Sequence, residues 1–112
     1  MIKNYYKNKD FNVWDYPQEY NNIYEKKIAF IAKKNKELLL IHCHQERNAI
    51  TLDDVKSLII QREQYIERHP ILEEYSIKVI YVISNFNIEE SAFWYIQENK
   101  NKINYEIVKQ KM

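Results

Sequence analysis

Two histidines, His42 and His44, follow an apolar run and are separated by one residue. Side chains alternate between the two faces of a strand, so we expect both imidazoles on one face and Cys43 on the other. Imidazole is a good ligand for Zn²⁺, Ni²⁺ or Cu²⁺, and this spacing would suit part of a metal site. The remaining candidate ligands are Glu46, His69 and a carboxylate of residues 15–25.

Nothing in the spacing of these residues selects a third ligand. A structural zinc site usually has four ligands at a recognisable spacing. We therefore expect no metal and no cofactor, and interpret His42 and His44 as polar residues left in an inactive cleft. If a metal binds at all, these two histidines are its expected ligands. Cys43 is interpreted as a small buried hydrophobe, because a nucleophilic thiol would need a base on its own face.

The composition of the chain excludes several classes of site. Its 112 residues include no glycine and one cysteine, and its formal net charge is +1. The lack of glycine excludes glycine-rich phosphate loops and dinucleotide-binding fingerprints. A single cysteine excludes an internal disulfide. The near-neutral charge argues against a strongly basic nucleic-acid binder. Local contacts with a nucleic-acid backbone are expected only from Lys33, Lys34, Lys36 and Arg47.

Length and hydropathy predict one globular domain over residues 1–112. The longest apolar runs, Leu38–Ile41 and Val79–Ile83, are too short to span a bilayer. Residues 1–10 are polar and lysine-rich, unlike a secretion signal. The expected location is therefore cytoplasmic, with no membrane partner.

The periodicity of apolar residues predicts the order α-β-β-β-α-β-α-β. The predicted ranges are 2–9, 11–16, 26–34, 37–44, 51–69, 76–84, 87–98 and 103–108. The continuous apolar character of 76–84 is typical of a strand that is buried on both faces by parallel pairing. The predicted fold class is α/β, with a central mixed sheet flanked by helices.

Local signals mark several boundaries. Asn35 suits the left-handed position of a tight turn between two strands. Thr51 and Asp54 form a capping box that starts a helix, and Asn87 with Glu90 is predicted to cap the next one. That later helix is apolar almost all round, which indicates a partner and makes a homodimer an expectation. Four large aromatic residues could supply a stacking or interaction surface, but most of them are expected in the core: Trp14, Phe93, Trp94 and Tyr95.

The order of elements and two segments of the chain resemble the restriction endonuclease-like fold, and Mrr-type nuclease domains in particular. In that family a strand carries Gly-hydrophobic-Asp, a hairpin follows, and the next strand carries Glu/Gln-x-Lys. Residues Lys27–Lys36 resemble the first strand with its hairpin, and Leu39–His44 resemble the next strand. The resemblance implies a Mg²⁺-dependent phosphodiester hydrolase.

The chain departs from the family at the positions that carry the chemistry. Ala29 stands at the aspartate position, His42 at the Glu/Gln position and His44 at the lysine position. Mg²⁺ requires oxygen ligands, which alanine lacks, and histidine has a pKa near ~6.5, so it is mostly neutral at pH 7. We therefore expect a catalytically inactive nuclease-like domain that binds nucleic acid weakly or not at all.

Two alternatives remain open at this point. One is an active metal-dependent DNA or RNA phosphodiesterase in which the ligands have migrated, with Asp15, Glu19 or Glu25 replacing the missing carboxylate. The other is a protein-interaction module in which the fold serves a dimer or another partner.

Overall fold

The computed structural model describes residues 2–21, 24, 26–44 and 48–109. Its order of helices and strands agrees with the prediction. Three α-helices, five strands and two short 3₁₀ helices succeed one another along the chain. They are α1 (Ile2–Lys7), β1 (Asn12–Asp15), η1 (Gln18–Asn21), β2 (Phe30–Lys34), β3 (Glu37–Cys43), α2 (Leu52–Arg68), η2 (Pro70–Leu72), β4 (Ser76–Ile83), α3 (Glu90–Glu98) and β5 (Ile103–Ile107).

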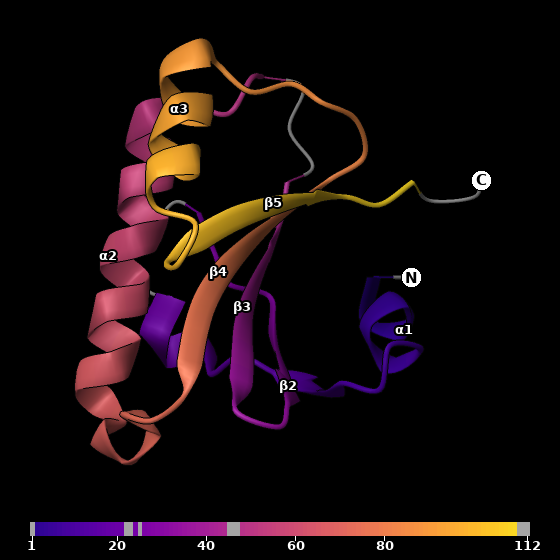
Figure 1. Ribbon diagram of the computed structural model, residues 1–112, viewed down its shortest axis with the longest axis vertical. Coiled ribbons are helices and arrows are strands. Elements are labelled where there is room, and N and C mark those ends of the chain that lie inside the picture. The colour runs from indigo at the N-terminus through magenta and orange to yellow at the C-terminus, as the bar shows by residue number, and fades with distance from the viewer. Residues whose placement is uncertain (1, 22–23, 25, 45–47, 110–112) are drawn as a thin grey trace.

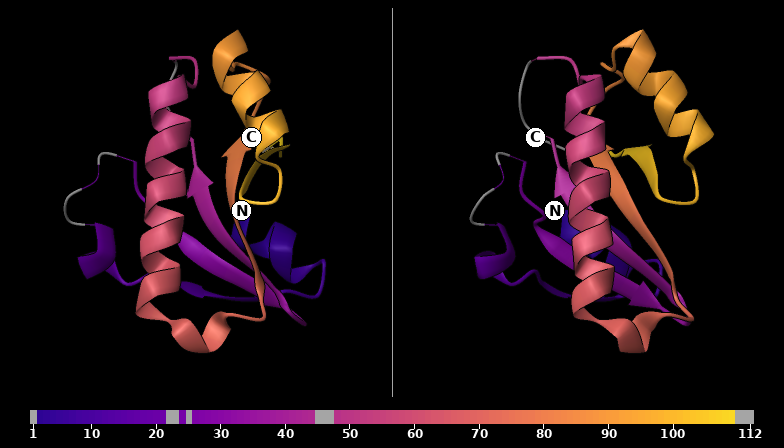
Figure 2. Two further views of the ribbon diagram at one scale, coloured as in Figure 1. Left: turned by 60° about the vertical axis from the view of Figure 1, so that its left-hand side comes forward. Right: turned by 90° about the vertical axis from the view of Figure 1, so that its left-hand side faces the viewer.

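The five strands form one mixed sheet in the order β1-β2-β3-β4-β5. The pairs β1–β2 and β2–β3 are antiparallel, whereas β3–β4 and β4–β5 are parallel. Helices α2 and α3 cover one face of the sheet and α1 lies against the other (Figures 1 and 2). This arrangement confirms the α/β class and the mixed sheet flanked by helices.

Strand β4 is buried on both faces, as its apolar run predicted. Val79 and Tyr81 belong to the larger core under α2 and α3, whereas Ile80 and Val82 belong to the smaller core under α1. Because α2 and α3 cover one face of the sheet and α1 covers part of the other, residues 79–83 have no solvated face, which explains the lack of polar alternation there.

The predicted start signal of α2 is present in full. The Asp54 amide donates to Thr51 Oγ1 at 3.2 Å, and the Thr51 amide donates to Asp54 Oδ2 at 3.1 Å. Val55, Leu58 and Ile59 are buried, so the predicted apolar face of the helix is the one that packs on the sheet.

The hairpin between β2 and β3 turns at Asn35, whose φ is 55°. Strand β2 is shorter than predicted and begins at Phe30, although the Ala29 backbone still bonds to Tyr16 and Ile41. Strand β1 ends at Asp15 and Pro17 lacks an amide hydrogen, so the ladder cannot continue there. The side chain of Asn21 instead pairs with the backbone of Ile28 at both its amide and its carbonyl.

Two predictions about α3 and the aromatic residues are wrong. The N-cap of α3 is Glu89, whose side chain makes no capping hydrogen bond. Residues 87–89 run extended beside Ile50, and the backbone carbonyl of Asn87 accepts the Ile50 amide at 3.0 Å. Trp14 and Trp94 are 42% and 56% exposed, since one lies on an edge strand and the other on the solvent side of α3. Phe93 and Tyr95 pack against the larger core, as expected.

Candidate functional site

Ala29, His42 and His44, the three residues that the resemblance singled out, lie where β2 begins and β3 ends. The Ala29 amide donates to the Ile41 carbonyl at 2.7 Å, which places Ala29 beside His42 at the same end of the hairpin. Ala29 is exposed, and its methyl group offers no oxygen to a cation. The structure thus brings Ala29 and His42 together, and this pair offers a methyl group and an imidazole but no carboxylate oxygen.

The His42 ring is packed inside the protein. It is 7% exposed, and its centroid lies 4.8 Å from that of Tyr81 in an edge-to-face contact. Nδ1 is 2.7 Å from the Lys27 carbonyl oxygen. Because a carbonyl only accepts, Nδ1 carries the proton in this contact. The ring therefore fastens the segment before β2 to β3.

His44 lies on the same side of the sheet as His42, as predicted, with 6.4 Å between the two ring centroids. The Tyr81 ring contacts both of them. His44 Nε2 lies 3.0 Å from the carbonyl oxygen of Asn48, so this nitrogen also faces an acceptor. Cys43 packs against the core under α1 on the opposite side, and burial raises the pKa of its thiol.

The structure does not gather the expected carboxylates around this pair. Asp15 pairs with Lys3 of α1 and thus lies on the opposite face of the sheet. Glu19 is exposed in η1. Among residues 2–21, 24, 26–44 and 48–109, no group of three or more His, Cys, Asp or Glu side chains could hold a metal ion. Three predicted residues lie outside the described residues: Glu25, Glu46 and Arg47.

His69 was the other candidate ligand, and it lies at the far, C-terminal end of α2. It stacks on Tyr65 with 4.3 Å between the centroids, and its Nδ1 lies 2.9 Å from the Tyr65 carbonyl oxygen. His69 is partly buried rather than fully solvated, and it closes the last turn of α2.

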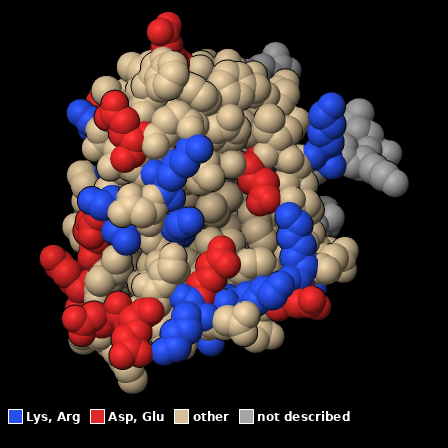
Figure 3. Space-filling model, in the orientation of Figure 1, with Lys and Arg blue, Asp and Glu red and all other residues tan. Residues whose placement is uncertain are grey.

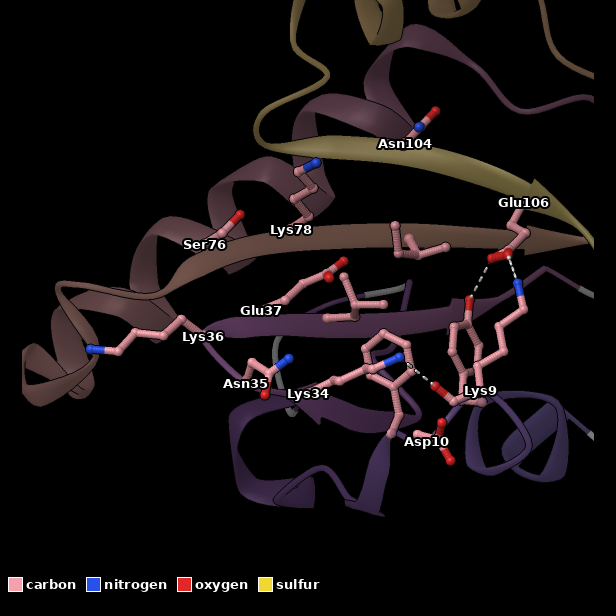
Figure 4. Close-up of a pocket in the computed structure, with 14 residues that line it drawn as sticks. Lys9, Asp10, Lys34, Asn35, Lys36, Glu37, Ser76, Lys78, Asn104 and Glu106 are labelled. Atoms are coloured by element: carbon pink, nitrogen blue, oxygen red, sulfur yellow. Dashed lines mark hydrogen bonds and ion pairs between the residues drawn. The ribbon is translucent and has the colours of Figure 1, made fainter.

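A groove of about 1050 Å³ lies on the other face of the sheet, between α1 and the outer surface of β3, β4 and β5 (Figure 4). Four lysines from separate turns and strands line it: Lys9, Lys34, Lys36 and Lys78. Three acidic residues also line it: Asp10, Glu37 and Glu106. Figure 3 shows basic side chains in the lower half of this face with acidic side chains among them, and a largely uncharged area near the top centre.

The hairpin lysines divide between the two faces of the sheet. Lys33 and Lys34 are neighbours on β2 and so point to opposite faces. Lys34 and Lys36 line the groove. The ammonium groups of Lys33 and Lys36 both lie near the Tyr75 ring, at 5.3 Å and 5.8 Å from its centre. Lys34 Nζ donates to the Lys9 carbonyl at 3.0 Å, and Lys36 pairs with the exposed Glu74 at 2.9 Å. An exposed ion pair contributes about 0–1 kcal/mol, so Lys36 can exchange Glu74 for another anion at little cost.

Glu106 closes one end of the groove. It accepts hydrogen bonds from Tyr5 at 2.8 Å and Tyr6 at 3.2 Å, and Lys9 Nζ lies 3.6 Å away. Burial, with the nearby Glu106 carboxylate, raises the pKa of Tyr6 well above its usual range. The cluster binds α1 to β5 and pairs Glu106 with Lys9, which is one of the four groove lysines.

The sequence contained only part of the signal for this groove. The tyrosines and Glu106 are about a hundred residues apart, and no local pattern predicts that α1 lies beside β5. Lys78 interrupts an otherwise apolar strand, and this was the one visible sign of a solvated patch on β4.

None of the helices in the described ranges is both long and apolar enough to cross a membrane. Comparisons of the chain with protein-family models, with curated proteins and with solved structures found no match.

Proposed function

We propose that this chain is a nuclease-like domain that no longer cleaves and that binds the phosphate backbone of a nucleic acid weakly along the lysine-lined groove. The observation that carries the proposal is the convergence of four lysines from three separate parts of the chain on one groove of about 1050 Å³. Nucleic-acid binding without base readout depends on such contacts between lysine and phosphate.

The loss of cleavage follows from what occupies the signature positions. A nuclease of this kind uses Mg²⁺ to polarise the phosphate and to lower the pKa of a water molecule. Mg²⁺ prefers carboxylate and water oxygens, whereas Ala29 supplies a methyl group and His42 a buried imidazole. His44 replaces the permanent charge of lysine with a ring whose Nε2 faces the Asn48 carbonyl.

The geometry also limits the strength of binding. Each lysine–phosphate contact adds about 0.9 to the slope of log affinity against log salt, so four contacts give a slope of about −3.6 at most. Affinity would then fall on the order of 100-fold between about 50 mM and 200 mM salt. Asp10 and Glu37 in the same groove oppose part of this attraction.

The experiment is a salt titration of a fluorescently labelled oligonucleotide followed by anisotropy, with single-stranded DNA, duplex DNA and RNA. Lys34→Gln and Lys78→Gln should each weaken binding and reduce the salt slope by about 0.9. Lys33→Gln removes the same charge from the opposite face and serves as the matched control. Glu37→Gln should strengthen binding, because it removes a negative charge from the groove.

Two results would overturn the proposal. The binding part fails if no oligonucleotide binds at low salt, or if Lys33→Gln weakens binding as much as Lys34→Gln. The non-cleaving part fails if the protein cuts plasmid, single-stranded DNA or RNA with Mg²⁺ or Mn²⁺, and this activity survives repurification but disappears in His44→Ala.

A further inference from the structure

Strand β5 forms one edge of the sheet, and its backbone shows which residues face outward. The Val79 amide donates to the Lys102 carbonyl and the Val108 amide to the Ile83 carbonyl, both at 2.8 Å. The backbone groups of successive residues point to alternate sides of a strand, so the amides and carbonyls of the even-numbered residues of β5 point towards β4. The backbone groups of residues 103, 105 and 107 therefore point away from the sheet.

Part of this outer edge is open. Two outward amides have local acceptors: Ile103 donates to the Asn99 carbonyl and Tyr105 to Asn104 Oδ1, both at 2.9 Å. Across the described part of the chain, no backbone bond satisfies the carbonyls of Ile103 and Tyr105 or the amide of Ile107 on this side. An edge strand with free groups of both kinds can pair with another strand.

An exposed aromatic cluster lies beside this edge. Phe86 is 53% exposed, and its ring centroid lies 5.9 Å from Phe93 and 5.8 Å from Tyr105. Phe93 also contacts Trp94, which is 56% exposed, and Ile107 at the end of β5 is 43% exposed. Part of the upper surface in Figure 3 carries few charged side chains, although α3 itself contributes Glu90 and Glu98. Apolar surface gathered at a free strand edge is typical of an interface rather than of a solvated rim.

We propose that two copies of this chain pair their β5 strands antiparallel about a two-fold axis at Tyr105, so that the two sheets become continuous. In this register Tyr105 faces its own copy, and Ile103 of one chain faces Ile107 of the other. All three positions point outward, so each facing pair is of the hydrogen-bonded kind. The Ile107 amide then donates to the Ile103 carbonyl of the second copy, and the Tyr105 amide exchanges Asn104 Oδ1 for the Tyr105 carbonyl of the second copy.

The side chains of β5 favour a second copy in this register. Each Glu106 faces Asn104 of the other chain, so a carboxylate meets an amide twice. A shift by two residues in one direction places Glu106 opposite itself, and like charges at facing positions destabilise a strand pair. A shift in the other direction shortens the paired region at the Ile107 end. The strand is thus complementary to itself about Tyr105, as a two-fold interface requires.

This pairing would also join the two grooves. Asn104 and Glu106 line the groove from β5, so their face of the strand continues into the same face of the second copy. The lysines of both copies would then border one surface. This consequence rests on the proposed function, whereas the pairing itself does not.

The test is sedimentation equilibrium of the full chain over micromolar to near-millimolar concentrations. The native chain should show a reversible dimer. Tyr105→Lys and Tyr105→Glu should each be monomeric, because they place like charges in contact at the axis, and an equal mixture of the two should recover the dimer. Ile107→Pro removes one outward amide without a bond to β4, and should weaken association at least tenfold in a folded chain.

The matched control is Trp14→Lys on the opposite edge strand, which should leave association unchanged. Any of three results overturns the proposal. The native chain stays monomeric; or the mixture of the two Tyr105 variants stays monomeric while Ile107→Pro still dimerises; or the native dimer is disrupted only by Trp14→Lys. Oligonucleotide binding is measured separately on the monomeric variants, so dimerisation and binding can fail independently.

Discussion

Asn21 is the residue whose replacement tests most directly how the start of β2 is held. Its side chain is 1% exposed and takes the place of a neighbouring strand. Nδ2 donates to the Ile28 carbonyl at 2.9 Å, and Oδ1 accepts the Ile28 amide at 3.1 Å. Ile28 lies between Lys27, whose carbonyl accepts from His42, and Ala29. The substitution Asn21→Leu keeps the size of the side chain and removes both bonds.

The expected loss follows from the burial of Ile28, which is 0% exposed. Both of its backbone groups would be left buried without a partner, at about 1–3 kcal/mol each. The free energy of unfolding should therefore fall by about 2–6 kcal/mol, a large share of the ~5–15 kcal/mol typical of a domain. Asn21→Asp keeps the acceptor but buries a carboxylate against the Ile28 carbonyl, so it should cost at least as much stability as Asn21→Leu.

The measurement is equilibrium unfolding in urea, followed by circular dichroism at pH 7. Asn12→Leu, at an exposed position on β1, is the control for the change of residue type and should alter stability by less than about 0.5 kcal/mol. If Asn21→Leu also costs less than about 0.5 kcal/mol with an unchanged urea slope, the two amide bonds do not support the segment. The role assigned to Asn21 would then be wrong.

Two further predictions concern α2 and the core beneath it. Thr51→Ala removes half of the capping box and should lower the free energy of unfolding by about 0.5–2 kcal/mol, measured by thermal or urea unfolding. Thr51→Ser keeps the hydroxyl oxygen and should lower it little. Equal losses of stability in both variants would contradict the capping role. Burial raises the pKa of Tyr16 to about 12, against an ordinary value of 10.0, so the folded state favours the neutral phenol. The contribution of Tyr16 to stability should be constant below about pH 10 and fall as the pH rises from there towards 12, because the tyrosinate is favoured in the unfolded chain. Tyr16→Phe should flatten this part of the pH profile in urea unfolding; an unchanged profile would assign the alkaline loss to other groups.

The order of elements was predictable because it depends on interactions between near neighbours in the chain. The capping box joins residues three apart, and Asn35 supplies the left-handed position of its own turn. The run at 76–84 indicated burial on both faces, since a strand without polar alternation has no solvated side. The placing of His42 and His44 opposite Cys43 likewise follows from the pleat of a single strand.

The same local reasoning failed where a distant segment decided the outcome. Asn87 has the side chain of an N-cap, yet its carbonyl accepts from Ile50 and the helix begins later. Trp14 and Trp94 have large apolar surfaces, but no other element of the described ranges covers them fully. Composition cannot show which aromatic residues the available helices will cover.

The sequence by itself determined the element order, the class of fold and the absence of oxygen ligands at positions 29, 42 and 44. Residue type and short-range spacing are sufficient for each of these. Only the tertiary structure decided that His42 is held by the Lys27 carbonyl, that four lysines share a groove, and that β5 has an open edge beside an aromatic cluster. These features join segments that are far apart in the chain, and their contacts form only when the sheet and its helices pack.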